Sequence, residues 1–196
     1  MIPFFIAYPR SGNHWMKAMA CTYFGKKKIK HDPNISYDVK IDDVLFFGGH
    51  ELLEMSEELR VLYLYRNPDD VLYSLLNAER RNDVQQEAIK LRKHLCKFLL
   101  RDNTTCIKYE KLQSDFIQEF SKLVYFFNKS CEYDQQKALL LNERFSKANL
   151  ARLDSKYMNK TLLSSKYQQN REAFRKQYGA TIKELVITDD LSKYFE

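Results

Sequence analysis

The sequence predicts an α/β fold: a three-layer α/β/α domain with a central, mainly parallel sheet and a helical C-terminal half. Short apolar runs alternate with amphipathic segments in the first half of the 196 residues, and helical periodicity fills the rest. Hydrophobic residues make up 44% of the chain, which favours a folded domain over disorder. A chain of this length suits a single domain that spans residues 1–196.

Four segments have the length and the β-branched or aromatic content of strands. They are residues 4–8, 44–47, 60–65 and 104–109. Pro9 ends the first, because proline cannot donate to a sheet ladder. The third has the strongest signal, and we expect it to be central and parallel. The lysine-rich residues 26–30 are expected to form a solvated loop, with a nucleic-acid or nuclear-targeting patch as the alternative.

Helices are expected where apolar residues recur every three or four positions. The segments are residues 15–21, 51–59, 69–81, 84–100, 116–127, 134–142 and 167–185. Residues 31–43 are expected to be a loop that can include a short helix. Asn67 can cap the helix at 69–81, and Pro68 suits its first turn. Asp69 and Asp70 complement the positive end of that helix.

The composition narrows the class of ligand. A formal net charge of +6 and an isoelectric point near 9.0 suit an anionic ligand, an acidic surface or nucleic acid, and do not choose among them. The four cysteines are far apart and lack zinc-type spacing, so we expect free thiols and no metal. No segment has the apolar length of a signal-peptide core or a membrane helix. We therefore expect a soluble, cytoplasmic protein without a membrane partner.

Residues 8–15 have the layout of an anion-binding loop. A strand ends at Pro9, a helix follows Gly12, and Arg10 in the loop and Lys17 in the helix add positive charge. This layout directs backbone N–H groups at an anion, and the glycine lets the backbone approach it closely. The Walker spacing G-x-x-x-x-G-K-S/T is absent, so the loop is not expected to hold ATP as ordinary P-loop kinases do.

Three strand ends are expected to meet at one edge of the sheet. Residues 8–12, 49–50 and 65–68 each follow a predicted strand, and the carboxyl ends of parallel strands lie along a common edge. The crevice there would contain Arg10, His50 and Arg66. Cations beside a titratable imidazole suit the transfer of an anionic group to a nucleophile.

Two motifs carry a resemblance to a known family. Residues 8–15, Tyr-Pro-Arg-Ser-Gly-Asn-His-Trp, resemble the 5′-phosphosulfate loop of the sulfotransferases that use 3′-phosphoadenosine 5′-phosphosulfate (PAPS). Residues 66–74 resemble the 3′-phosphate motif of the same family, R-N-P-x-D-x-x-x-S, with Arg66 first and Ser74 last. Weaker matches at residues 49–50, 109–112 and 144–150 extend the resemblance over about residues 4 to 150.

The resemblance implies a P-loop NTPase-like fold and PAPS as the sulfuryl donor, with no metal. It implies that His50 is the catalytic base and that Arg10 stabilises charge on the departing bridging oxygen. Arg66 and Ser74 would bind the 3′-phosphate, and Trp15 would stack on adenine, as would Phe145. The residues expected to bind the cofactor are Arg10, Ser11, Gly12, Asn13, His14, Trp15, Arg66, Ser74, Tyr109 and Phe145.

Some assignments stay open. Glu51 or Glu54 is the alternative base. Trp15 is alternatively a core residue, and His14 either touches the phosphosulfate or packs. The family's C-terminal R-K-G-x-x-G-x-W loop has no clear counterpart, because residues 174–177 lack its glycines and lie in a helical pattern. Two lysines, Lys156 and Lys160, are candidates to close the site instead.

The sequence therefore predicts a sulfotransferase that acts on a hydroxyl, or less readily an amine. Its acceptor would be a small molecule, a carbohydrate or a peptide, and the sequence specifies neither this acceptor nor the oligomeric state. An ATP-dependent P-loop-type kinase is the alternative within enzymes. A non-catalytic module that binds nucleotides or nucleic acid is the alternative outside them, and a nucleic-acid partner is disfavoured.

Overall fold

The computed structural model describes residues 2–30, 44–50, 58–79, 83–130, 132–146, 149 and 165–196. The chain divides into two compact units. The first, here called the sheet unit, comprises Met1–Arg66 and Arg101–Leu141, and the second, the helical unit, comprises Asn67–Leu100 and Asn142–Glu196. The expectation of a single domain stays a prediction.

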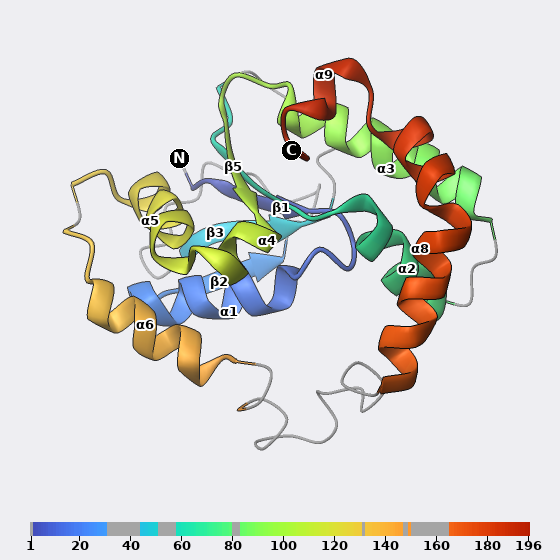
Figure 1. Cartoon of the computed structure of the whole chain (residues 1–196). Helices are drawn as coiled ribbons and strands as arrows, with labels where there is room; N and C mark the ends of the chain where they lie inside the picture. Colours follow the sequence, from blue (N-terminus) through green and yellow to red (C-terminus); the bar gives the residue numbers. More distant parts are fainter. Residues whose placement is uncertain are drawn as a thin grey trace. The chain divides into compact units, whose positions relative to one another are not determined.

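The sheet unit is built on a parallel sheet (Figure 1). In the described part of the chain the sheet has five strands in the order β2-β3-β1-β4-β5, and every neighbouring pair is parallel. The strands are β1 (Phe4–Ala7), β2 (Lys27–Lys30), β3 (Val44–Gly49), β4 (Val61–Tyr65) and β5 (Thr104–Lys108). The predicted α/β class and all four predicted strands are confirmed, and β4 is paired on both sides, as expected.

The prediction of a loop at residues 26–30 is wrong. Lys27–Lys30 form β2, in which Lys28 pairs with Phe46 and Lys30 with Gly48. The segment lacks an apolar pattern because β2 is an edge strand, and lysines on edge strands protect them from pairing with other chains. The side chains of Lys27 and Lys28 are exposed, so the expected solvation does hold for them.

Buried apolar side chains hold the sheet and its helices together. Every residue of β1 is fully buried, which is why this strand has a continuous apolar sequence instead of an alternating one. The helices of the sheet unit are α1 (Asn13–Phe24), α4 (Tyr109–Ser114), α5 (Phe116–Phe127) and α6 (Gln135–Arg144), the last of which continues past Leu141. Tyr23 of α1 meets Phe120 of α5 edge to face, with ring centroids 5.5 Å apart.

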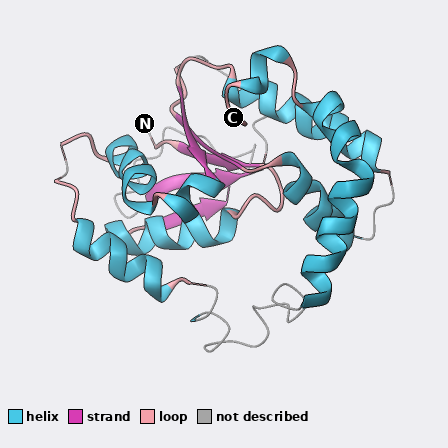
Figure 2. Cartoon of the chain, in the orientation of Figure 1, coloured by secondary structure: helices cyan, strands magenta, loops and turns pink. Residues whose placement is uncertain are grey.

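The helical unit consists, where described, of α2 (Pro68–Glu79), α3 (Val84–Leu99), α8 (Ser165–Val186) and α9 (Asp189–Ser192) (Figure 2). Asn67 caps α2 as predicted, because its Oδ1 accepts from the backbone N–H of Asp69 at 3.0 Å. The predicted helices at 69–81, 84–100 and 167–185 are confirmed, and the short α9 was not predicted.

A buried carboxylate joins α2 to α8 within the helical unit. Asp70 accepts hydrogen bonds from the Nε and Nη2 of Arg171 at 2.7 and 2.5 Å and from the Nη2 of Arg175 at 2.7 Å. The sequence assigned Asp70 to the positive end of α2, and the structure adds these two ion pairs. Residues 174–177 lie inside α8, in agreement with their helical pattern.

Some predictions fall outside the described residues. The loop at 31–43 lies there, as does nearly all of the helix expected at 51–59. The alternative bases Glu51 and Glu54 and the lysines at 156 and 160 also lie there.

Candidate active site

The loop after β1 turns sharply into α1. Arg10 has a φ of +69° and Gly12 a φ of +89°, so two of its residues have left-handed backbone conformations. Turns of this kind direct successive N–H groups to one side and favour anions. α1, which the structure describes throughout, has no acidic residue in its first turn and no side chain capping its start. Its first N–H groups therefore suit an anion.

Tyr109 lies against this loop and explains why position 12 is glycine. A Cβ built on Gly12 would lie 2.5 Å from Cε2 of the Tyr109 ring, far inside van der Waals contact. The Trp15 ring packs edge to face on Tyr109, with centroids 5.9 Å apart. Tyr109 itself is buried. The tyrosine thus fixes the loop and Trp15 relative to the end of β5.

Arg66 joins the same cluster from the end of β4. The guanidinium Cζ lies 4.6 Å from the centroid of the Tyr109 ring, and Nη1 donates to the carbonyl oxygen of Arg10 at 3.3 Å. The strand register accounts for this contact: Tyr65 pairs with Lys108, so the residues that follow them are neighbours. The structure therefore brings Arg10, Gly12, Trp15, Arg66 and Tyr109 together. The sequence predicted Arg10 and Arg66 at a shared strand edge, and it did not predict the contacts of Tyr109.

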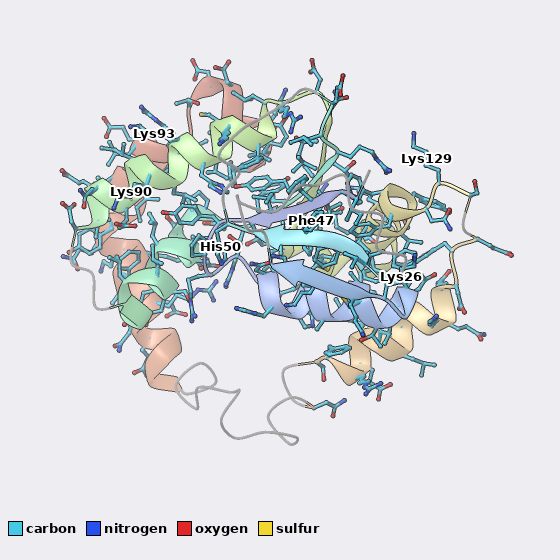
Figure 3. All side chains as sticks on the ribbon, turned by 180° about the vertical axis from the view of Figure 1, so that it is seen from behind. Lys26, Phe47, His50, Lys90, Lys93 and Lys129 are labelled. Carbon is cyan, nitrogen blue, oxygen red and sulfur yellow. The ribbon has the colours of Figure 1, made fainter. Side chains whose placement is uncertain are left out.

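His50 follows the last residue of β3, beside the end of β1 (Figure 3). Its Nδ1 lies 2.7 Å from the carbonyl oxygen of Ala7, the last residue of β1. Because a carbonyl oxygen only accepts, Nδ1 carries the hydrogen and donates. The neutral imidazole then has its lone pair on Nε2, which is the tautomer that a general base on an exposed ring requires.

Lys17 is a further basic residue of this region. The sequence alone indicates only that it adds positive charge. Its side chain is buried, its Nζ lies 5.1 Å from the centroid of the Phe5 ring, and a Cβ on Gly48 would lie 2.9 Å from that nitrogen. Burial and the charge of Lys28 lower the pKa of Lys17 to about 7, against a small opposing effect of Cys21. The sequence does carry a signal of this burial, because the spacing of Lys17 from Asn13 and Met16 places it on the buried side of α1.

His14 is exposed, at the start of the same helix. Partial burial lowers the pKa of His14, and the charges of Lys28, Lys17, His50 and Arg10 lower it further. Four basic groups of the sheet unit therefore act on His14. At the start of α1, the side-chain oxygen Oδ1 of Asn13 is buried and has no hydrogen-bond partner among the residues that the structure describes.

The two remaining predicted residues belong to the helical unit. Ser74 is buried in α2, and Phe145 follows α6 with its ring 5.9 Å from the guanidinium of Arg144. Their part in cofactor binding stays a prediction, as do the cofactor contacts of every other predicted residue and the catalytic roles of His50 and Arg10.

The described residues hold no group of three or more His, Cys, Asp or Glu side chains arranged to bind a metal. Cys21, Cys96 and Cys106 are free thiols. Among the described helices, none is both long and apolar enough to cross a membrane.

This sheet, with its loop and helix after the first strand, defines an α/β fold shared with sulfotransferases. The crystal structure of the mouse sulfotransferase SULT7A1 complexed with PAP matches with a TM-score of 0.66 over 98% of this chain and 87% of the mouse chain. The two sequences are 16% identical, so the similarity establishes the fold. No protein-family model matches the sequence. No curated protein matches it either.

Proposed function

We propose that the protein is a sulfotransferase that transfers the sulfuryl group of PAPS to a hydroxyl, or less readily an amine. One observation carries the proposal: the imidazole of His50 is fixed to the end of β1, directly before the loop from Tyr8 to Trp15. The proposed general base and the proposed anion-binding loop are thus side by side. The fold shared with a sulfotransferase that binds PAP (3′-phosphoadenosine 5′-phosphate) supports the same assignment.

The loop and the start of α1 would hold the 5′ end of the cofactor. Backbone N–H groups of residues 12–15 offer hydrogen bonds to an anion at a helix N-terminus, whereas the N–H of Ser11 donates to the carbonyl oxygen of Tyr8. Arg66 and Ser74 would hold the 3′-phosphate, because a guanidinium fork matches phosphate geometry. The motif at residues 66–74 supports that role. Trp15 and Phe145 are the proposed contacts of the adenine.

The proposed chemistry needs a base and a site for developing negative charge. Bound PAPS supplies a sulfuryl group on a good leaving group. Nε2 of His50 would remove the proton of the acceptor hydroxyl as the acceptor oxygen attacks sulfur. Arg10 would stabilise the negative charge that the bridging oxygen gains as its bond to sulfur breaks. No residue role in this scheme requires a metal.

Transfer from labelled PAPS tests the proposal. The full chain is incubated with PAPS carrying labelled sulfur and a panel of phenols, sugars and peptides, with chelator to remove divalent cations. Labelled product is the expected result. Phosphoryl transfer from ATP that requires Mg²⁺ would overturn the proposal in favour of a kinase. Salt-sensitive binding of DNA or RNA without any transfer would favour a binding module. The cytoplasmic location stays a prediction of the sequence.

A further inference from the structure

Lys17 is a buried cation without an anionic partner. Its relative exposure is 4%, and its ammonium group lies over the ring of Phe5 and against Gly48. Among the residues that the structure describes, none forms a hydrogen bond or an ion pair with it. Buried charges are ordinarily paired, because removing an unpaired charge from water is costly. Such a residue in a basic region indicates a place for an anion that comes from outside the chain.

The lowered pKa of Lys17 is consistent with a place for an external anion beside it. Burial and the charge of Lys28 on β2 lower its pKa to about 7, and Cys21 on α1 opposes this only weakly. His14, one helical turn before Lys17, adds a further basic group to the surroundings. The lysine is therefore close to half protonated at neutral pH. A bound anion would raise its pKa and draw in a proton.

The position of Lys17 separates it from two of the residues proposed to hold the cofactor, Arg66 and Tyr109. β1 lies in the middle of the sheet, with β3 and β2 on one side and β4 and β5 on the other. Lys17 contacts β1 and β3, and Lys28 lies on β2. Arg66 and Tyr109 follow β4 and β5. Lys17 lies against Gly48 of β3, and His50 follows two residues later. Lys17 therefore lies on the side of the sheet from which the proposed base extends.

We propose that Lys17, assisted by Lys28, binds an anionic group of the acceptor, so that the acceptor is an acidic molecule whose hydroxyl reaches His50. The anionic group is a carboxylate, a sulfate ester or a phosphate ester. Lys28 is exposed and attracts the acidic acceptor from solution, whereas Lys17 contacts the group once it is bound. This inference rests on the proposed sulfotransferase activity and adds the class of substrate.

Matched acceptor pairs test the proposal. Each pair differs only in charge: methyl glucuronide against methyl glucoside, and a tyrosine peptide flanked by aspartates against one flanked by asparagines. We expect kcat/KM to be about tenfold or more higher for the acidic member, as one charge-assisted hydrogen bond provides. A third pair, a sulfated sugar against its unsulfated form, separates the sources of the anion. Equal rates, or faster transfer to the neutral members, overturn the proposal.

The variant Lys17→Met removes the charge and keeps the length of the side chain. It should lower kcat/KM about tenfold for acidic acceptors and leave neutral acceptors and PAP affinity unchanged. Lys28→Met should give a smaller loss that disappears at high salt. The exposed Lys129 supplies the control, and Lys129→Met should change nothing. Weaker PAP binding by Lys17→Met would instead place Lys17 in the cofactor site and overturn the proposal.

A binding measurement keeps this test independent of turnover. Methyl glucuronide is titrated by calorimetry into the chain saturated with PAP at pH 7, in buffers of different ionisation enthalpy. We expect proton uptake on binding in the wild type and less in Lys17→Met, since a pKa of about 7 leaves part of Lys17 neutral at pH 7. Failure of PAP itself to bind contradicts the proposed function. Binding of PAP with no preference for the glucuronide contradicts this proposal alone.

Discussion

Nδ1 of His50 donates a hydrogen bond to the carbonyl oxygen of Ala7, 2.7 Å away, and so attaches the end of β3 to the end of β1. Forty-three residues separate the two in the chain, and the parallel pairing of β1 with β3 brings them together. The bond fixes which ring nitrogen carries the proton. It thereby leaves Nε2 as the nitrogen that can accept one.

Replacing His50 with asparagine should separate its two roles. The amide of His50→Asn can still donate to Ala7, but it cannot accept a proton from an acceptor hydroxyl. We expect kcat to fall by about a hundredfold or more while the Kd of PAP stays within about twofold. Steady-state kinetics and calorimetry measure the two quantities. A kcat within tenfold of the wild type would direct the search for the base to Glu51 or Glu54.

Gly12 and Gly25 form a matched pair for testing the role of Tyr109. Both have positive φ, at +89° and +64°, so alanine is strained at either position. A Cβ meets Tyr109 at position 12 and nothing within 4 Å at position 25. Gly25→Ala should therefore cost about 1 kcal/mol of unfolding free energy and Gly12→Ala about 3 kcal/mol. Urea denaturation compares them, and equal losses would show that the ring does not constrain the loop.

Arg66 and Arg60 flank β4 in similar surroundings. Arg66 lies over Tyr109 and donates to the carbonyl oxygen of Arg10, while Arg60 lies over Phe126 and donates to the carbonyl oxygen of the same residue. Each substitution by alanine should cost about 1 kcal/mol of stability.

Only Arg66→Ala should also weaken PAP binding, by about tenfold or more, because only this arginine is proposed to contact phosphate. Ser74→Ala should weaken PAP binding less, since a neutral hydroxyl makes a weaker hydrogen bond than a guanidinium. Calorimetric Kd values of PAP for the three variants measure these differences. If Arg60→Ala weakened PAP binding as much as Arg66→Ala, the effect would reflect lost stability and not a binding contact.

Lys17 should make the stability of the protein depend on pH. Its folded pKa of about 7 lies below the ordinary value of 10.5, so between these pH values the unfolded chain binds more protons than the folded one. The resulting destabilisation is complete at pH 7 and below, and it disappears as the pH rises toward 10.5. Each unit corresponds to about 1.4 kcal/mol, so the full effect is on the order of a few kcal/mol.

Lys17→Met should accordingly have a higher Tm than the wild type at pH 7, and the difference should shrink as the pH is raised toward 10. Thermal melts across this range measure the difference, with Lys129→Met as the exposed control. A variant that is less stable than the wild type at pH 7 would mean that the lysine is paired in solution.

Asp70 should be critical for the helical unit. Asp70→Asn breaks the ion pairs with Arg171 and Arg175 and leaves Asp69 as a remaining carboxylate beside the two arginines, at a cost of about 3 kcal/mol. Asp190 is exposed in the first turn of α9 and provides the control. Asp190→Asn should cost less than about 0.5 kcal/mol. Similar losses in the two variants, measured by chemical denaturation, would show that the ion pairs contribute little.

The parts of the fold with local signals were predictable. The apolar runs of β1, β3, β4 and β5 identify strands by composition, and Asn67 with Pro68 identifies the start of α2 by its capping chemistry. Residues 27–30 carry no such signal, because an edge strand of lysines is defined by its partner β3 and not by its own side chains. The short α9 likewise has no apolar pattern of its own.

The candidate site also has residues whose positions were predictable from the sequence and residues whose positions were not. Arg10, His50 and Arg66 were predictable because each follows a strand of a parallel sheet. The central position of Tyr109 was not, because it depends on the register of β5 against β4 and on how closely the loop at Gly12 approaches. The burial of Lys17 depends equally on contacts with Phe5 and Gly48, which are distant in sequence.

Calorimetric titration of PAP into the wild-type chain, with divalent cations removed, tests whether the protein binds the nucleotide that sulfuryl transfer from PAPS leaves behind. We expect saturable binding of one PAP per chain that does not require Mg²⁺ and that exceeds the binding of ATP. The absence of PAP binding, or binding of ATP alone and only with Mg²⁺, would contradict the proposed function.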